Sequence, residues 1–272
     1  MRGNPDPAGR AHPPGARGRH VGVHMIGTAV LALVVALASP QATSNPVDLP
    51  MALAAPVAPQ SDTPTRTPRR ADFGAHSASV EARQIADWVG DSRDNGDAGF
   101  VIVDKQQARI HVFDAAARLR ATSAVLLGAA IGDDSVPGIG TRPIAAVLPH
   151  ERTTPAGRFV AEAGHNAGGE DVVWVDYDAA VSMHRVRATN PKERRLQRLA
   201  SPTAADNRIS YGCINVPAAF YDSNLQPLFA DRTAIVYVLP ETRSAQQVFN
   251  AYDVDALRGA SHGAAIRLSR LQ

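Results

Sequence analysis

Residues 207–217, Asn-Arg-Ile-Ser-Tyr-Gly-Cys-Ile-Asn-Val-Pro, contain the only cysteine of the chain. The apolar segment before Gly212 reads as the end of a strand, and Pro217 is typical of a helix start. A thiol at such a strand-to-helix junction lies near unpaired backbone N–H groups and a helix dipole, and both favour the thiolate. Gly212 permits close approach of a substrate, and the N–H groups of Gly212 and Cys213 could hold a developing oxyanion. The stretch predicts a reactive thiol, with a buried inert cysteine as the simpler alternative.

A thiol nucleophile also needs a proton acceptor, and His184 is the best candidate among the nine histidines. It lies in the strand-like residues 181–186. A single histidine is more often structural or exposed than catalytic, so only the wider pattern selects His184. The others lie in the N-terminal region, the flanks, a strand or loops: His12, His20, His24, His76, His111, His150, His165 and His262.

Composition excludes several classes of protein. One cysteine rules out an internal disulfide framework and any cysteine-cluster zinc or iron–sulfur site, and the sequence has no HExxH motif, so we expect no metal and no other cofactor. The 272 residues carry 28 Lys and Arg against 26 Asp and Glu, a net charge of +2, and only Lys105 and Lys192 are lysines. This balance argues against a nucleic-acid-binding protein.

The N-terminus has the pattern of an export signal. Residues 1–24 carry four arginines against one aspartate, residues 25–38 are uncharged and mostly apolar, and residues 36–38 form a small-x-small cleavage site. The apolar run is shorter than the ~20 residues of a spanning helix, so residues 1–38 predict a cleaved signal peptide, with an uncleaved anchor as the alternative. Residues 39–76, rich in Pro and Ala, predict a flexible linker. We therefore expect a protein of the periplasm or cell envelope that meets the membrane only through its N-terminal segment.

The rest of the chain predicts a mostly β fold with small helices. We expect an N-terminal helix and its connection over 77–98, a catalytic domain over 99–240, and a C-terminal helix and tail over 241–272. Residues 128–143 read as a surface loop. The charged residues 190–207 read as a solvated loop or short helix, with a lid near the site as the alternative. Strands are expected at 100–104, 109–114, 121–127, 158–163, 172–176, 181–186 and 233–239, and helices at 77–89, 217–229 and 243–252.

Three motifs, in order along the chain, resemble the catalytic domain of the L,D-transpeptidases, the YkuD-like family. Residues 101–114 (VIVDKQQARIHVFD) are similar to the family's opening hairpin, and residues 154–159 (TPAGRF) to its T-P-x-G-x-F element. Residues 210–215 (SYGCIN) are similar to its S-H-G-C-hydrophobic-R/N signature. One such motif would be weak, but the ordered set is specific. The resemblance covers residues 99–240, about half the chain, and implies a β-sandwich or barrel-like catalytic domain.

The resemblance also implies roles for residues around the thiol. Cys213 corresponds to the acylated nucleophile and His184 to its general base. An oxyanion site and hydrogen-bond frame are implied for Gly212, Ser210 and Asn215.

Two residues depart from the family pattern. Tyr211 stands where a histidine is usual, and Arg185 stands where a small residue usually follows the catalytic histidine. The carbonyl that orients the imidazole survives any side chain at 185, but a phenol is no base near neutral pH. With Arg208, these two residues are the candidates for substrate binding, and the departures put the choice of substrate in doubt.

The activity implied by the resemblance is a two-step acyl transfer on peptidoglycan stem peptides. Cys213 would attack the carbonyl between the third-position diamino acid and the terminal D-Ala of a tetrapeptide, releasing D-Ala and leaving a thioester. The acceptor would be an amine of a second stem or a lysine of a wall-anchored lipoprotein. Water as acceptor would instead make an L,D-carboxypeptidase, and a catalytically silent wall-binding module is the alternative from another class.

Overall fold

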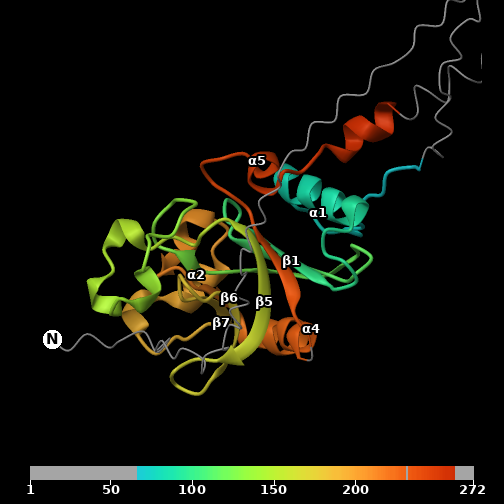
Figure 1. Cartoon of the computed structure of the whole chain (residues 1–272). Helices are drawn as coiled ribbons and strands as arrows, with labels where there is room; N and C mark the ends of the chain where they lie inside the picture. Colours follow the sequence, from blue (N-terminus) through green and yellow to red (C-terminus); the bar gives the residue numbers. More distant parts are fainter. Residues whose placement is uncertain (1–65, 231, 261–272) are drawn as a thin grey trace, which may run out of the picture. The chain divides into compact units, whose positions relative to one another are not determined.

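The computed structural model describes residues 66–230 and 232–260. The predicted signal peptide, 1–38, and residues 39–65 of the predicted linker lie outside the described residues. Strands dominate the described part (Figure 1). Eight of them form one sheet in the order β3-β2-β1-β10-β5-β6-β7-β9, with β4 and β8 as a separate pair. The strands are β1 (Phe100–Asp104), β2 (Arg109–Phe113), β3 (Leu119–Ala124), β4 (Leu127–Gly128), β5 (Gly157–His165), β6 (Asp171–Asp176), β7 (Val181–Arg185), β8 (Arg208–Ser210), β9 (Ile214–Val216) and β10 (Ala234–Val238).

The two ends of this sheet are joined, which makes it barrel-like. The strands β1, β2 and β3 form the predicted antiparallel meander, while the β1–β10 and β7–β9 pairs are parallel. Leu126, just after β3, exchanges two backbone hydrogen bonds of 2.9 Å with Asn215 of β9. Because β3 and β9 are the outermost strands, this exchange nearly closes the sheet. The prediction of a mostly β, barrel-like domain is confirmed.

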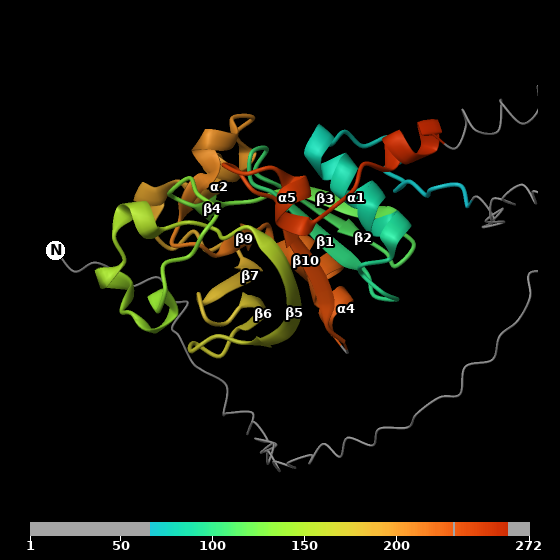
Figure 2. The same ribbon diagram turned by 45° about the horizontal axis from the view of Figure 1, so that its top comes forward.

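Two apolar cores lie on opposite faces of the strands, as the alternation of side chains along a strand requires. Val101 and Val103 of β1 face the inner core, which the segment Tyr221–Leu225 and α4 also cover. Phe100 and Ile102 face the outer core, which is covered by α1 and α5. Figure 2 shows these two groups of helices on different sides of β1 and β10.

The helices are short and occupy the predicted regions. Ser79 caps α1, and its Oγ accepts a hydrogen bond from the N–H of Ala82 (3.0 Å). The predicted helix 217–229 is interrupted by a π-helical stretch just before Pro227, which lacks the N–H that regular bonding needs. The helices are α1 (Val80–Ser92), α2 (Arg195–Ala200), α3 (Ala218–Phe220), the π-helical Tyr221–Leu225, α4 (Gln226–Phe229) and α5 (Ala245–Phe249), with 3-10 turns at Ile139–Thr141, Ile144–Ala146, Pro149–Glu151, Pro191–Glu193 and Ala204–Asn207. The last described residues, 254–260, are also helical.

The described part of the predicted linker is packed against the domain. Phe73 is buried in the outer core and meets the ring of Phe113 edge to face. The backbone N–H groups of Arg69 and Ala71 donate to side chains of α1, at 2.6 and 2.7 Å. The boundary predicted at residue 76 is therefore wrong, because an apolar ring and paired backbone groups anchor residues 69–73.

His111 of β2 is buried, and among the described residues neither of its ring nitrogens has a hydrogen-bond partner. Burial, with smaller contributions from the nearby Arg109 and Arg83, lowers its pKa to about 4. An unfolded histidine titrates near 6.5, so between about pH 6.5 and 4 the unfolded chain binds more protons than the folded one. As the pH is lowered through that window, His111 should therefore reduce the free energy of unfolding by ~3 kcal/mol. Above the window, the free energy of unfolding should not depend on the titration of His111.

We expect His111→Leu to remove this part of the acid sensitivity, since leucine is of similar size and takes up no proton. The measurement is the free energy of unfolding in urea near pH 7 and near pH 4.5, compared between variant and wild type. His150→Gln, at an exposed position, is the control and should keep the wild-type difference. An equal loss of stability on acidification in His111→Leu and wild type would contradict the assignment.

Candidate active site

Cys213 lies in a tight turn between two strands, β8 and β9. The first α-helical residue after it is Ala218, five positions later, and α3 is only three residues long. The predicted strand-to-helix junction is therefore wrong, because Ile214–Val216 pairs with β7 before any helix begins. Because Cys213 is not at the start of a helix, the sequence-based argument that a helix dipole favours its thiolate no longer applies.

The turn is held by Ser210 at its start. Ser210 Oγ donates to the carbonyl of Cys213 (2.6 Å) and accepts from the N–H of Gly212 (3.1 Å). The Gly212 N–H, expected as an oxyanion donor, is thus already paired in this state. Gly212 has φ +129°, and a Cβ there would lie 2.8 Å from the carbonyl oxygen of Thr153. Only glycine fits this position.

Thr154, from the T-P-x-G-x-F element, supports the turn from the other side. Its Oγ1 donates to the carbonyl of Gly212 (2.8 Å) and accepts from the N–H of Gly128 (2.9 Å). Its own carbonyl accepts from Nζ of the fully buried Lys105 (2.9 Å). Sequence reasoning placed both residues in family motifs without giving either a role. They form a chain of contacts from the residue that follows β1 to the turn that carries the thiol.

His184 lies on β7 directly across from Asn215 on the parallel neighbour β9. Its Nδ1 is 2.9 Å from the carbonyl oxygen of Arg185. Because a carbonyl only accepts, Nδ1 carries a proton and Nε2 of the neutral ring carries a lone pair. Nε2 lies 3.2 Å from Nδ2 of Asn215, an amide donor. Nε2 is therefore the ring nitrogen that can take up a proton.

The thiol and the imidazole lie against the same face of β7. Cys213 Sγ is 3.7 Å from Ser182 Oγ and 3.6 Å from the carbonyl oxygen of Ala180. Ser182 stands two residues before His184, so the two side chains share one face of the strand. Cys213 and His184 are both more than nine-tenths buried. Sequence reasoning missed Ser182, although its spacing from His184 is the signal that could have found it.

Arg185 points away from this face. Its Nη1 donates to Asp171 (2.7 Å) and its Nε to Asp222 (2.7 Å), and its guanidinium stacks on the ring of Tyr221 at 4.2 Å. These contacts follow from the alternation of side chains along β7, which places Arg185 and His184 on opposite faces of the strand. The structure therefore does not bring this predicted substrate-binding residue to the thiol.

The other two predicted substrate-binding residues lie nearer to the turn. Arg208 forms an ion pair with Glu241 and donates to the carbonyl of Lys105 (2.9 Å), so its charge is already compensated. Tyr211 is partly exposed beside Gly212, and the guanidinium of Arg152 stacks on its ring at 4.1 Å. Of the three candidates, Tyr211 is the one that the structure places next to the thiol with an exposed surface.

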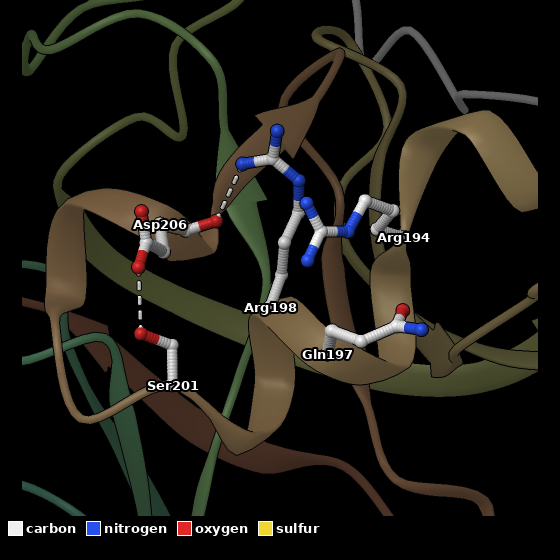
Figure 3. A pocket seen from close by; sticks show the side chains of 5 residues that line it. All are labelled: Arg194, Gln197, Arg198, Ser201 and Asp206. Atoms are coloured by element: carbon white, nitrogen blue, oxygen red, sulfur yellow. Dashed lines mark hydrogen bonds between the residues drawn. The ribbon is translucent and has the colours of Figure 1, made fainter.

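The inserted residues 190–207 reach the site through Arg195 of α2. This side chain is only 7% exposed, and its Nη1 donates to Oδ1 of Asn215 (2.5 Å). The insertion contains the short helix that was predicted, α2, but it is not solvated throughout, because one of its arginines is buried against the residue that contacts His184. Away from this contact, the insertion surrounds a small hollow of about 170 Å³ (Figure 3), lined by Arg194, Gln197, Arg198, Ser201 and Asp206.

Within residues 66–230 and 232–260, no three side chains of His, Cys, Asp or Glu are arranged to hold a metal ion. In the same ranges, no helix is long and apolar enough to cross a membrane.

Comparison with known proteins gives matches only among solved structures. No protein-family model and no curated protein matches the sequence. A helical cell shape determining protein from Campylobacter jejuni is 12% identical over 63% of this chain and 58% of that chain, with a TM-score of 0.34. An L,D-transpeptidase from Xylanimonas cellulosilytica is 13% identical over 53% and 62%, with a TM-score of 0.32. The catalytic domain of the E. faecium L,D-transpeptidase is 18% identical over 53% and 98%, with a TM-score of 0.29.

The matched region thus spans less than two thirds of the first two of these chains. Identities and TM-scores of this size do not decide the family. The family resemblance rests on the three sequence motifs.

Proposed function

We propose that the chain is a peptidoglycan L,D-transpeptidase that works through a thioester on Cys213. The observation that carries the proposal is the placement of the only cysteine and of His184 against one face of β7, with His184 Nδ1 turned to the carbonyl of Arg185 and Nε2 to the amide of Asn215. A buried thiol needs a nearby base to become a nucleophile, and this arrangement supplies one. The three family motifs supply the substrate class.

The first step transfers the acyl group of the donor stem to the enzyme. The Cys213 proton moves to His184 Nε2 while sulfur attacks the carbonyl carbon before D-Ala. The bond from that carbon to the D-Ala nitrogen then breaks, and the nitrogen takes the proton from Nε2. The oxyanion would form at the turn, where the Gly212 N–H must leave Ser210 Oγ in order to bind it.

The second step returns the enzyme to its starting state. An amine of a second stem, or of a lipoprotein lysine, gives a proton to Nε2 and attacks the thioester, and sulfur leaves and recovers that proton. The same acyl-enzyme with water would release a tripeptide. We place the reaction in the cell envelope, with the N-terminal segment as the only link to the membrane.

The test is incubation of the full chain with purified disaccharide-tetrapeptide, followed by mass spectrometry of the products. We expect a dimer that has lost one D-Ala, formed by wild type and absent with Cys213→Ala. Tripeptide monomer alone would replace the proposal by an L,D-carboxypeptidase. An absence of product from wild type, or equal product from both proteins, would contradict the proposed activity.

A further inference from the structure

The segment between β7 and β9 contributes one buried charge to the site. Arg195 donates from Nη1 to Asn215 Oδ1 and from Nε to Glu193 Oε2, each at 2.5 Å. The second contact stays within the insertion and compensates the charge. The first contact reaches the strand that lies beside His184.

The contact with Arg195 fixes which way the Asn215 amide faces. A guanidinium has donors and no acceptor, so Asn215 must present its oxygen to Arg195. The amide nitrogen then faces His184 Nε2 (3.2 Å) and, more distantly, the carbonyl of Cys213 (3.4 Å). Turning the amide over would place its N–H groups against those of Arg195, which is unfavourable in a buried site.

This orientation acts on the protonation of His184. Nδ1 donates to the carbonyl of Arg185, so only Nε2 changes between the neutral ring and the imidazolium. The neutral ring accepts at Nε2 from the Asn215 amide. The imidazolium would carry a proton there, so two donors would face each other. The amide cannot turn to accept that proton while Arg195 holds its oxygen.

We propose that Arg195 is a positioning residue that, through Asn215, holds His184 as the neutral Nδ1–H tautomer and disfavours a resting thiolate–imidazolium pair with Cys213. The roles of His184 and Cys213 in this statement rest on the proposed function. The Cys213 proton then leaves the sulfur only when a substrate carbonyl is attacked, and the Asn215 amide must give way to the proton arriving at Nε2. An insertion in the chain thereby sets the proton state of the base.

The Arg195 charge also disfavours the imidazolium and is partly offset by Glu193, while the other charges on β7 lie on the far face. From β7, the Arg185 guanidinium points to the opposite face, where Asp171 and Asp222 hold it. From the β8–β9 turn comes the Cys213 thiol, and from α2 comes the Arg195 charge with Glu193 beside it. Loss of the Arg195 charge would itself favour the imidazolium, as would loss of its contact with Asn215.

The test is the pH dependence of Cys213 alkylation by iodoacetamide in the full chain, compared between wild type, Arg195→Met and Arg195→Lys. The chain has one cysteine, so the rate reports on it alone. In Arg195→Met the Asn215 amide is free to turn and accept a proton from the imidazolium. We expect its alkylation profile to move down by about one pH unit, with about tenfold faster alkylation near pH 7. Arg195→Lys keeps a charge and a donor, and should stay close to wild type.

Arg198→Met is the matched control on the same helix. Arg198 donates to the carbonyls of Glu193 (3.0 Å) and Asp206 (2.7 Å), the second drawn in Figure 3, and both partners lie within the insertion. Its removal loosens the insertion without releasing Asn215, so its alkylation profile should match wild type. Circular dichroism of each variant establishes that the fold is retained.

A second measurement reads the proton state in wild type directly. Nitrogen-15 NMR of the reduced protein near pH 7 should show His184 protonated at Nδ1 only. Protons on both ring nitrogens would overturn the inference, as would a shift below about 0.3 pH unit in Arg195→Met or an equal shift in Arg198→Met.

These readouts need no peptide substrate, so they separate the inference from the proposed function. A shifted profile without any cross-linked product would leave the inference standing and remove the proposed function. Cross-linked product together with an unshifted alkylation profile in Arg195→Met would support the proposed function and overturn the inference about Arg195.

Discussion

Replacing His184 by alanine is expected to slow Cys213-dependent release of D-Ala from a tetrapeptide by ~10²- to 10⁴-fold, the usual contribution of a general base. The physical reason is that Nδ1 faces the carbonyl of Arg185, so Nε2 is the ring nitrogen that can take up the thiol proton, and the ring lies with the thiol against one face of β7. The measurement is the initial rate of D-Ala release at saturating donor peptide. The loss should appear in kcat, because the proton moves only in the transition state.

The control for this prediction is His165→Ala. His165 is exposed at the end of β5, so its loss should leave the rate within about twofold of wild type. Free imidazole should restore part of the activity of His184→Ala, because the substitution leaves a space of the same shape. A rate for His184→Ala within tenfold of wild type would remove His184 as the base.

Lys105→Met is expected to lower the free energy of unfolding by ~3–5 kcal/mol, the range found when one member of a buried ion pair is removed. Lys105 Nζ donates to Asp133 (2.9 Å) and to the carbonyls of Gly132 (2.6 Å) and Thr154 (2.9 Å). Burial lowers the pKa of Lys105 to about 8, so the ammonium is still charged near pH 7. Methionine fills the space but removes a donor from the carbonyls of Gly132 and Thr154 and the positive charge beside the buried Asp133 carboxylate. The urea midpoint should fall by roughly 1–2 M.

The chain offers a matched control in its other lysine. Lys192 is exposed in the insertion, and Lys192→Met should leave the urea midpoint within error of wild type. A midpoint for Lys105→Met equal to that of Lys192→Met would show that the remaining donors to Asp133 compensate fully; these are the backbone N–H groups of Glu241, Thr242 and Arg243 and the hydroxyl of Thr242. That result would contradict the prediction.

Much of the architecture follows from local sequence pattern. Strands and helices were predictable where apolar residues alternate or recur over a whole element, as in β1, β10 and α1. Cys213 and His184 could be chosen from the sequence because one is unique and the other ends a strand within an ordered set of motifs. The helix predicted from Pro217 does begin there, at Ala218, but the short strand before it, Ile214–Val216, was missed because it pairs with β7, a partner about 30 residues away in the chain.

The supporting contacts were not predictable for the same reason. Arg195 looks like any arginine of a charged segment, and only the folded chain shows that it is buried against Asn215. Arg185 follows the candidate base in sequence, yet strand alternation sends its side chain to the other face. Lys105 and Thr154 are 49 residues apart in the chain, and their hydrogen bond cannot be predicted from the local pattern of apolar residues.

The parallel pairing of β7 with β9 also determines when the chain acquires its chemistry. His184 and Asn215 meet across 31 residues, whereas the β1–β2 hairpin closes between Asp104 and Arg109. Closing a longer loop costs more chain entropy before its contacts repay it, so distant parallel strands dock after local hairpins. A nascent molecule can thus hold most of its secondary structure while base and nucleophile are still apart. We therefore expect Cys213 to become reactive only after β7 and β9 have paired, later than the local hairpins.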